Sequence, residues 1–382
     1  MSEARVNNLS NESNTGGPTI TGITTFSGAN YFVPPVGTIA ERPDNPEKGS
    51  LRFNTDSAKL EYYRGDGIGW TEIEASYEND SLPESGGYTG FIAGGNDPSP
   101  WTGLNVIQYY HIATLGSGAD FGDLETGKTG SGTVCNKIRA VWPGGYTGAG
   151  YHIHISYNNI QSKGDGIDYG DLIGVKNCPP TINNQTRGII GQAANQNSSP
   201  YVSNVLEYIT IATTGDTKDF GDGQIKSSCF GCCSTTRGLW GAPGNTPAKV
   251  IYTTMSTLGD TTDFGTTTHR PYAGLSNAVR AVWSGDYFGN AMSYMTIATL
   301  GNGIDFGDLD VSRDSARGMS SPTRGLVAGG RSVPSQATIN TISSFQIATT
   351  GNAIDFGDIV HMTNAADHSY NFFAGSTGHG GL

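Results

Sequence analysis

The sequence predicts an all-β protein, most of it a β-propeller, and three observations support this. Gly supplies 56 of the 382 residues and charged residues only 15%, which excludes a long-helix protein because helix interiors reject Gly. The 18 Tyr, 14 Phe and 5 Trp are more than a charged disordered chain carries. A short motif, typified by GNGIDFGDL, recurs along the chain, and an apolar alternation of period two precedes its copies.

The motif sets the architecture. Its copies centre on an Asp that is followed by an aromatic residue, at Asp120, Asp168, Asp219, Asp263, Asp305 and Asp355. The steps between these positions are 48, 51, 44, 42 and 50 residues. Six copies at such a period predict a propeller or a solenoid array.

One unit contains four short strands. The first is rich in small residues, as in RPYAGLS; the second is of the type RGLVAGG; the third alternates, as in YITIATTG; and the fourth is DFGDL. Four antiparallel strands form a propeller blade. We favour six blades, with seven possible, because a last segment, YNFFAGS from Tyr370, has no third or fourth strand after it. We expect it to pair with the first blade and cover an open edge.

The N-terminal part differs from the repeats. Residues 1–35 are polar, lack hydrophobic periodicity and are expected to form an extended attachment arm, because Pro34 and Pro35 restrict the chain. The sequence of residues 36–80 predicts a small β module with strands that begin at Leu51, Lys59 and Trp70. Residues 81–382 form the predicted propeller. Since the module is too small to be stable alone, we expect a homotrimer or another symmetric homo-oligomer, held through residues 1–80.

Composition also excludes several function classes. The net charge of −12 argues against sequence-independent nucleic-acid binding, which needs Lys and Arg against phosphates. The sequence has no run of 18 apolar residues, so we expect no membrane span. Its start lacks an apolar signal core, so Sec export is not expected. An odd number of Cys, five, does not predict a disulfide framework.

The sequence resembles known virion proteins in two regions. GTIAERPDNPEKGSLRFNTDSAKLEYYRGDGIGWTEI resembles small N-terminal modules of tail-fibre and other virion structural proteins of tailed phages. YITIATTGDTKDFGDG and TRGLVAGG are similar to kelch-like repeats in virion proteins of marine and cyanobacterial phages. The resemblance covers the chain from about Val33 to its end, and it implies a kelch-like propeller and a location in the virion.

The repeated DFGD element superficially matches the magnesium-binding motif of protein kinases. The Gly-rich loop, strand Lys and catalytic loop that a kinase also needs are absent from the sequence, so we exclude that interpretation. We expect the aromatic residue of each copy to be a core wedge between blades. These residues are Phe121, Tyr169, Phe220, Phe264, Phe306 and Phe356.

An Arg begins the second strand in five of the six units, and the first unit, TGFIAGG, lacks it. These residues are Arg139, Arg187, Arg237, Arg280 and Arg324. Since an Arg fork matches a carboxylate, we predict that each pairs with a repeat Asp and fixes the blade register. A ligand-directed or solvent-facing role remains the alternative for the Arg residues, and structural calcium remains one for the Asp-rich turns.

Two further clusters invite a metal-site interpretation. Cys229, Cys232 and Cys233 contain a C-x-x-C, but no second ligand pair follows, so we expect small packing residues in a first strand. His152 and His154 face one side of a strand. They form either a metal pair or, as we favour, an ordinary polar strand edge. We predict no metal and no cofactor.

The loops between the second and third strands break the repeat. They are rich in Tyr, Trp, Ser, Asn and Gly, the composition of adaptable recognition loops. Candidate binding residues are Trp101, Tyr146, Tyr201, Tyr287 and Phe288. The alternative is that these loops vary because nothing constrains them.

Together these features predict a non-enzymatic phage virion structural protein. We expect a fibre or appendage that contacts other virion proteins through residues 1–80 and carries a distal propeller for assembly or for adhesion to a host-surface glycan or protein. The alternatives are a capsid or neck decoration protein without a receptor role, or a propeller hydrolase or lyase that acts on surface polysaccharide.

Overall fold

The computed structural model describes residues 34–57, 59–65, 67–73, 89–95, 103–114, 116–194, 202–224, 230–241, 247–286, 289–333, 335, 337–360 and 375–376. The chain divides into two compact units, Met1–Ala75 and Ser76–Leu382. The described residues form strands and turns, with one 3₁₀ turn at Ile39–Glu41 and no α-helix, so the predicted all-β class is confirmed. None of the elements described is a helix that could span a membrane.

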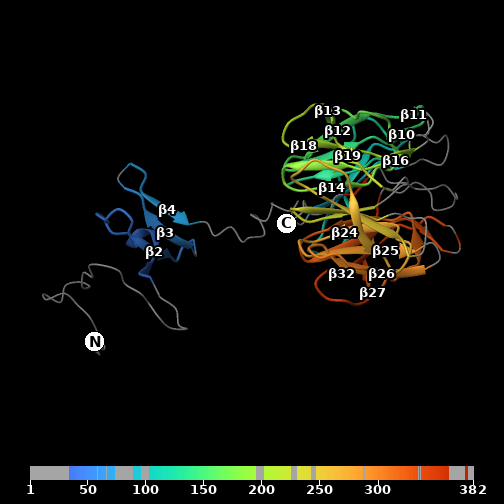
Figure 1. The fold of residues 1–382 in the computed structure, drawn as a ribbon. Helices are drawn as coiled ribbons and strands as arrows, with labels where there is room; N and C mark the ends of the chain where they lie inside the picture. Colours follow the sequence, from blue (N-terminus) through green and yellow to red (C-terminus); the bar gives the residue numbers. More distant parts are fainter. Residues whose placement is uncertain are drawn as a thin grey trace, which may run out of the picture. The chain divides into compact units, whose positions relative to one another are not determined.

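The smaller unit is a four-stranded sheet in the order β1-β2-β3-β4 (Figure 1). Its strands are β1 (Val36–Gly37), β2 (Leu51–Asn54), β3 (Lys59–Tyr63) and β4 (Trp70–Ile73). The three strands predicted from the sequence are confirmed. The strand β1 was not predicted; it pairs parallel with β2, and Phe53 N donates a hydrogen bond of 2.8 Å to Pro35 O beside it.

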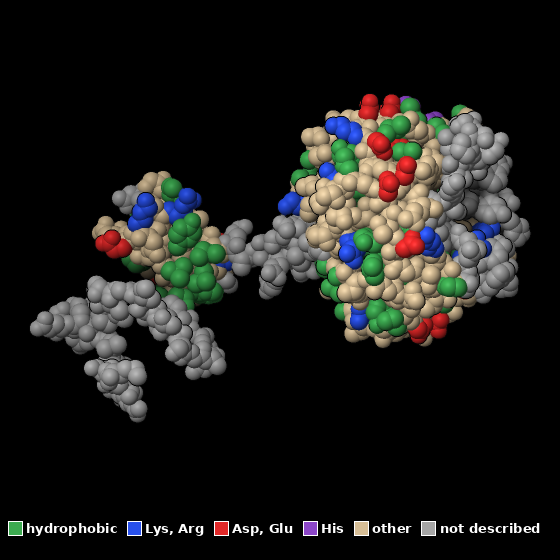
Figure 2. All heavy atoms as spheres, viewed as in Figure 1, with side chains coloured by type: hydrophobic (Ala, Val, Ile, Leu, Met, Phe, Trp, Pro, Cys, Tyr) green, Lys and Arg blue, Asp and Glu red, His purple; other side chains and the backbone are tan. Residues whose placement is uncertain are grey.

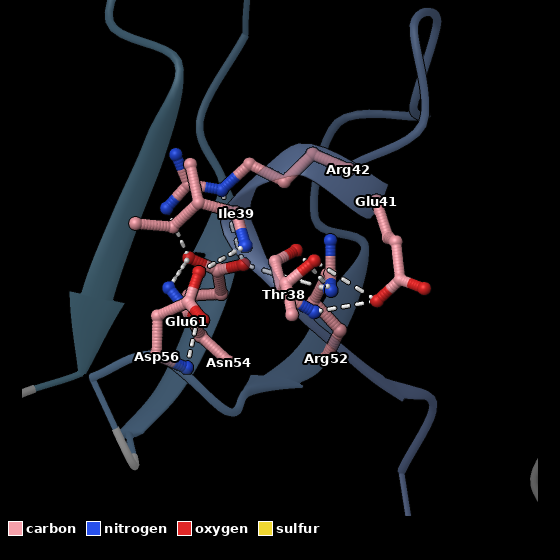
Figure 3. Close-up of polar contacts among 8 residues, drawn as sticks. All are labelled: Thr38, Ile39, Glu41, Arg42, Arg52, Asn54, Asp56 and Glu61. Carbon is pink, nitrogen blue, oxygen red and sulfur yellow. Dashed lines mark hydrogen bonds and ion pairs between the residues drawn. The ribbon is translucent and has the colours of Figure 1, made fainter.

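One face of this sheet holds a buried carboxylate (Figure 3). The Glu61 side chain is fully buried and accepts hydrogen bonds from Arg42 Nη2 at 2.5 Å and Asn54 Nδ2 at 3.3 Å. Arg52 Nε lies 3.5 Å from the same carboxylate. The bond to Glu61 raises the pKa of Arg42. A buried carboxylate needs such partners, so the charges on this face are satisfied within the module.

The larger unit contains six four-stranded sheets, numbered here in chain order. Sheet 1 contains β5 (Thr89–Ala93), β6 (Val106–His111), β7 (Ala119–Asp123) and β34 (Gly375–Ser376). Sheet 2 contains β8 (Val134–Cys135), β9 (Arg139–Pro143), β12 (His154–Asn159) and β13 (Ile167–Asp171). Sheet 3 contains β14 (Thr181–Asn183), β15 (Arg187–Ile190), β18 (Val205–Thr210) and β19 (Lys218–Asp222).

The remaining sheets repeat this plan. Sheet 4 contains β20 (Phe230–Cys233), β21 (Arg237–Gly241), β22 (Lys249–Thr254) and β23 (Thr262–Thr266). Sheet 5 contains β24 (Ala273–Ser276), β25 (Arg280–Asp286), β26 (Gly289–Thr296) and β27 (Ile304–Asp308). Sheet 6 contains β29 (Arg317–Ser320), β30 (Arg324–Ala328), β32 (Thr341–Gln346) and β33 (Ile354–Asp358).

Three short ladders supplement these sheets. They are β10 (Tyr146–Thr147) with β11 (Gly150–Tyr151), β16 (Ala193–Ala194) with β17 (Val202–Ser203), and β28 (Arg313–Asp314) with β31 (Arg331–Ser332).

Sheet 1 takes its fourth strand from the other end of the chain. In β34, Gly375 and Ser376 pair antiparallel with Ala93 and Ile92 of β5. In sheets 2–6, by contrast, the strand at this edge directly precedes its partner in the sequence. The predicted pairing of the C-terminal segment with the first unit is therefore confirmed, and it covers an edge of β5 that would otherwise be open.

Every third-to-fourth strand pairing contains a β-bulge, which explains the repeat motif. In sheet 3, Leu206 pairs with Gly221 and Glu207 with Asp219, so Phe220 is the extra residue. The Phe220 side chain is 2% exposed. A bulge frees the backbone of the extra residue from the ladder and turns its side chain inward. The six predicted aromatic wedges are all buried.

The apolar core lies between neighbouring sheets. Phe121 of sheet 1 packs in one cluster with Ala140 and Trp142 of sheet 2, and four further clusters join sheets 2–3, 3–4, 4–5 and 5–6 in the same way. A sixth joins sheet 6 to sheet 1, with Phe356 beside Ile92 and Tyr110. The prediction that the wedges pack between blades agrees with these clusters.

Candidate functional site

The repeat Arg residues join each sheet to the next. Arg139 Nη1 of sheet 2 donates to Ile211 O at the end of β18 in sheet 3, at 3.1 Å. Its guanidinium also lies over the ring of Tyr157, 4.5 Å from the centroid. The chain turns directly after this third strand, so the Ile211 carbonyl has no hydrogen-bond donor among the described residues of its own sheet. The Arg139 guanidinium supplies that donor.

The same bond recurs at four other sheet junctions. Arg187 Nη1 donates to Met255 O, Arg237 Nη1 to Ile297 O, Arg280 Nη1 to Ile347 O, and Arg324 Nη1 to Ile112 O, at 2.9–3.1 Å. The last bond connects sheet 6 to sheet 1. Arg187, Arg237 and Arg280 also lie over Tyr208, Tyr252 and Tyr294.

The prediction that the repeat Arg residues form ion pairs with the repeat Asp residues is therefore wrong. All six repeat Asp residues are exposed on the fourth strand, and among the described side chains none forms an ion pair with a repeat Arg. Asp263 instead pairs with Lys249 at 2.7 Å, and Asp219 Oδ1 accepts the N–H of Gly221 at 3.2 Å. The Arg residues do fix the arrangement of neighbouring sheets, but their acceptors are backbone carbonyls.

A Lys substitutes where the Arg is missing. The first unit has Thr89 at the Arg position, and Tyr109 is the equivalent of the stacked Tyr residues. Lys163, from the turn that precedes β13 in sheet 2, lies 4.9 Å from the Tyr109 ring centroid. Its Nζ also donates to Asp120 O at 3.2 Å. Sequence reasoning noted the missing Arg but overlooked the Lys, which only this copy carries in the turn between its third and fourth strands.

The DFGD motif itself forms a backbone latch. Between sheets 2 and 3, Gly215 N donates to Tyr169 O at 2.7 Å and Thr217 N to Asp171 O at 2.9 Å. Asp216 Oδ1 accepts the N–H of Asp171 at 3.0 Å. Equivalent backbone pairs join the other consecutive sheets.

The latch also joins the last sheet to the first. Gly116 N donates to Phe356 O at 3.1 Å and Gly118 N to Asp358 O at 3.3 Å. Ser117 Oγ here accepts the N–H of Asp358, at 3.3 Å. The carbonyl that the bulge frees thus finds its donor in the next sheet at all six junctions, and this structural contact explains why the motif recurs.

A third set of contacts links the first strands. Asn183 exchanges two hydrogen bonds with the backbone of Cys135, and Ser276 does the same with Cys233. Cys232 and Cys233 are buried in β20, as predicted, and burial raises the pKa of the Cys233 thiol to about 11. A thiol held in its neutral form is a poor nucleophile and metal ligand. Cys229 lies outside the described residues.

Buried cations reinforce three junctions. Lys128 Nζ donates to Trp142 O at 2.8 Å, Lys176 Nζ to Val205 O at 2.7 Å, and Arg313 Nη1 to Thr341 O at 2.8 Å. Each lies eight residues after the Asp of its repeat. Lys176 also pairs with buried Glu207 at 3.3 Å. Burial lowers the pKa of Lys128 to about 7 and that of Arg313 to about 10.

The remaining candidate is a patch formed by the loop between β9 and β12 and by the first residue of β12, defined here as the hairpin patch: Tyr146, Thr147, Tyr151, His152 and His154. The rings of Tyr146 and Tyr151 lie 5.2 Å apart and those of His152 and His154 5.9 Å apart. All five side chains are half-buried or exposed. In Figure 1, the β10–β11 hairpin lies at the margin of the larger unit.

Hydrogen bonds hold the patch in place. His152 Nε2 lies 2.5 Å from Thr147 Oγ1, and His154 Nδ1 lies 2.8 Å from Asp171 Oδ1. Partial burial lowers the pKa of His152, and the neighbouring His154 and Lys128 act in the same direction. Fixed aromatic rings beside hydroxyl and imidazole groups can stack on a sugar or anchor a protein side chain.

The patch contains one of the five predicted binding residues. Tyr146 lies in β10, where its backbone exchanges hydrogen bonds with Thr129. Trp101, Tyr201, Tyr287 and Phe288 lie outside the described residues. Within the part of the chain that the structure describes, no three His, Cys, Asp or Glu side chains form a group that could hold a metal ion.

No protein-family model and no curated protein matches this chain.

Proposed function

We propose that the six sheets are the blades of a closed, kelch-like propeller. Three independent contacts between sheet 6 and sheet 1 support this: the Arg324 bond to Ile112 O, the latch at Gly116 and Gly118, and the shared apolar cluster. The pairing of β34 with β5 supports it further, because it supplies the first blade with its missing strand. Six blades account for every complete repeat.

We propose that the protein is a non-enzymatic virion structural protein of a tailed phage, a fibre or appendage. The observation that carries the proposal is that the repeated Arg and aromatic residues join neighbouring sheets. A rigid ring of this kind presents loops, and the described hairpin patch has the ring and hydroxyl groups of a recognition surface. The resemblance of the N-terminal module and the repeats to phage proteins supports a location in the virion.

The test is to locate the chain on particles. We expect mass spectrometry to find the protein in purified virions and immunogold labelling with antibodies against residues 81–382 to mark a fibre or appendage. Label on the capsid or neck, with no effect of the antibodies on adsorption, would favour a decoration protein. Absence from the particles would overturn the proposal.

The recognition role has its own test. Tyr146→Ala combined with Tyr151→Ala should weaken adsorption of particles that carry the variant, because both rings of the patch are removed. Lys137→Gln, on an exposed side chain in the turn between β8 and β9, is the control. Unchanged adsorption would show that the hairpin patch does not contribute, while leaving the virion location intact.

A further inference from the structure

The small N-terminal sheet has one apolar face. Directly opposite one another across the four strands lie Val36, Phe53, Leu60 and Ile73. Two residues along, Leu51 pairs with Tyr62, which also pairs with Thr71. Residues that pair directly or lie two apart point to the same side of a sheet. These seven residues, here called the module face, therefore form one surface.

The module face is exposed and carries no charge. Val36 is 57% exposed, Leu51 42%, Ile73 41% and Leu60 37%. None of its seven residues is Asp, Glu, Lys, Arg or His. Figure 2 shows hydrophobic side chains gathered over the module in one view. An uncharged patch of large apolar side chains on so small a sheet marks an interaction site.

The side chains on the other face of the sheet already have partners within the module. There Glu61 is enclosed by Arg42, Arg52 and Asn54, and Trp70 packs with Tyr63 and Arg52. A sheet is stable in water when its apolar face packs on a second layer. Among the described residues of the smaller unit, no element supplies that layer, so the missing layer belongs on the module face.

We infer that the module face is the surface through which copies of this chain associate, each module packing on the same face of another copy. An uncharged apolar face is complementary to itself, since no like charges meet when two copies approach. Two sheets that pack face to face lie about 10 Å apart and interdigitate their side chains. The row from Val36 to Ile73 provides side chains in that arrangement.

The chain's own N-terminal segment is the competing occupant. The sequence of residues 1–33 shows no period-two apolar alternation, the pattern expected of a strand that covers an apolar sheet face. This inference deepens the proposed function, because it names the surface that holds the oligomer. It concerns the purified chain, so its failure is distinct from absence from the virion.

The test measures the mass of the full chain in solution by light scattering. We expect an oligomer of the 40.1 kDa chain that Val36→Lys and Leu60→Lys, singly or together, convert to monomer. Leu258→Lys, at a site of 58% exposure in the larger unit, is the matched control and should remain oligomeric. The unfolding midpoint of the larger unit should be unchanged in all variants.

A shortened chain, residues 34–382, separates the two occupants. We expect it to retain the oligomer. A monomeric full chain would overturn the inference, and so would a shortened chain that associates only after the segment is removed. An oligomer that survives Val36→Lys combined with Leu60→Lys would also overturn it, and so would one that survives Val36→Lys combined with the uncharged polar change Ile73→Ser.

Discussion

Arg139 shows how one side chain connects two sheets. It begins β9, stacks on Tyr157 of its own sheet and donates to Ile211 O of the next. Arg139→Gln retains part of the length but loses the charge and the stack. We expect it to lower the free energy of unfolding by about 1–2 kcal/mol, since the bond is charge-assisted and half-buried. Urea denaturation of the full chain measures this.

The neighbouring Lys137 is the matched control. Its side chain is exposed, so Lys137→Gln should change the free energy of unfolding by less than about 0.5 kcal/mol. Equal effects of the two substitutions would contradict the role assigned to the Arg residues.

Lys128 makes stability depend on pH in the alkaline range. Its pKa is about 7 in the folded protein, because burial disfavours the ammonium, against the ordinary value of 10.5. Between these values the unfolded chain binds more protons, so stability rises with pH, by up to about 1.4 kcal/mol per pH unit from this group. Below pH 7 its contribution is constant.

Lys128→Met should remove that slope. The difference in unfolding free energy between the natural protein and the variant should grow in favour of the natural protein from pH 7 to about 10. Lys137→Met, on an exposed side chain, should leave the slope unchanged. A pH-independent difference for Lys128→Met would show that the folded lysine titrates normally.

The residue scale also marks the limit of sequence reasoning. The recurrence of Arg139 and its equivalents was visible, and so was their structural role. Their acceptors were not, because a sequence pattern lists carboxylates but does not reveal which backbone carbonyls the end of a strand leaves unpaired. The same reason hid the hydrogen bond from Lys163 to Asp120 O.

At the scale of the element, the bulge in each third-to-fourth strand pairing requires Gly. Gly221 has φ of 144°, and a Cβ there would lie 2.5 Å from the carbonyl of Gly259 in the next sheet. Gly259 has a similar φ of 151° but open space around it. The two glycines therefore differ chiefly in whether the backbone of the next sheet lies close to the added Cβ atom.

Gly221→Ala should be more destabilising than Gly259→Ala. Both substitutions strain the backbone by about 1–3 kcal/mol, and the clash at Gly221 adds about 1–3 kcal/mol. Thermal unfolding followed by circular dichroism compares them. Equal losses would mean that the contact between the sheets yields readily and that the latch is not rigid.

Elements with strong alternation were predictable, while short ones were not. The third strands and the DFGD strands lie where the sequence placed them, because period two and the recurring Gly leave few other conformations. The two-residue strand β1 was missed, since Val36–Gly37 has no pattern of its own and is held only by backbone hydrogen bonds, from Phe53 N to Pro35 O and from Thr55 N to Gly37 O.

At the scale of the whole molecule, the interactions that join neighbouring sheets explain most of the conserved spacing within the chain. The latch and the apolar clusters recur between all consecutive sheets and again between sheet 6 and sheet 1, and the Arg bonds recur at five of these six junctions. The sequence predicted six units and the return of the C-terminal segment. It did not predict the module face. Val36 and Leu60 are exposed because the polar residues around Glu61 fill the opposite face of the sheet, and the sequence does not reveal which face they fill.

The central claim is that the six sheets close into one ring, and amide hydrogen exchange of the full chain tests it most directly. Gly116 and Gly118 donate their N–H groups to sheet 6, as Gly215 and Thr217 donate theirs to sheet 2. In a closed ring all four amides should have protection factors within about tenfold of one another, because each amide can exchange only when the two sheets that its hydrogen bond joins separate. Full protection at Gly215 and Thr217 with rapid exchange at Gly116 and Gly118 would mean that the sheets form an open array, and would contradict the account.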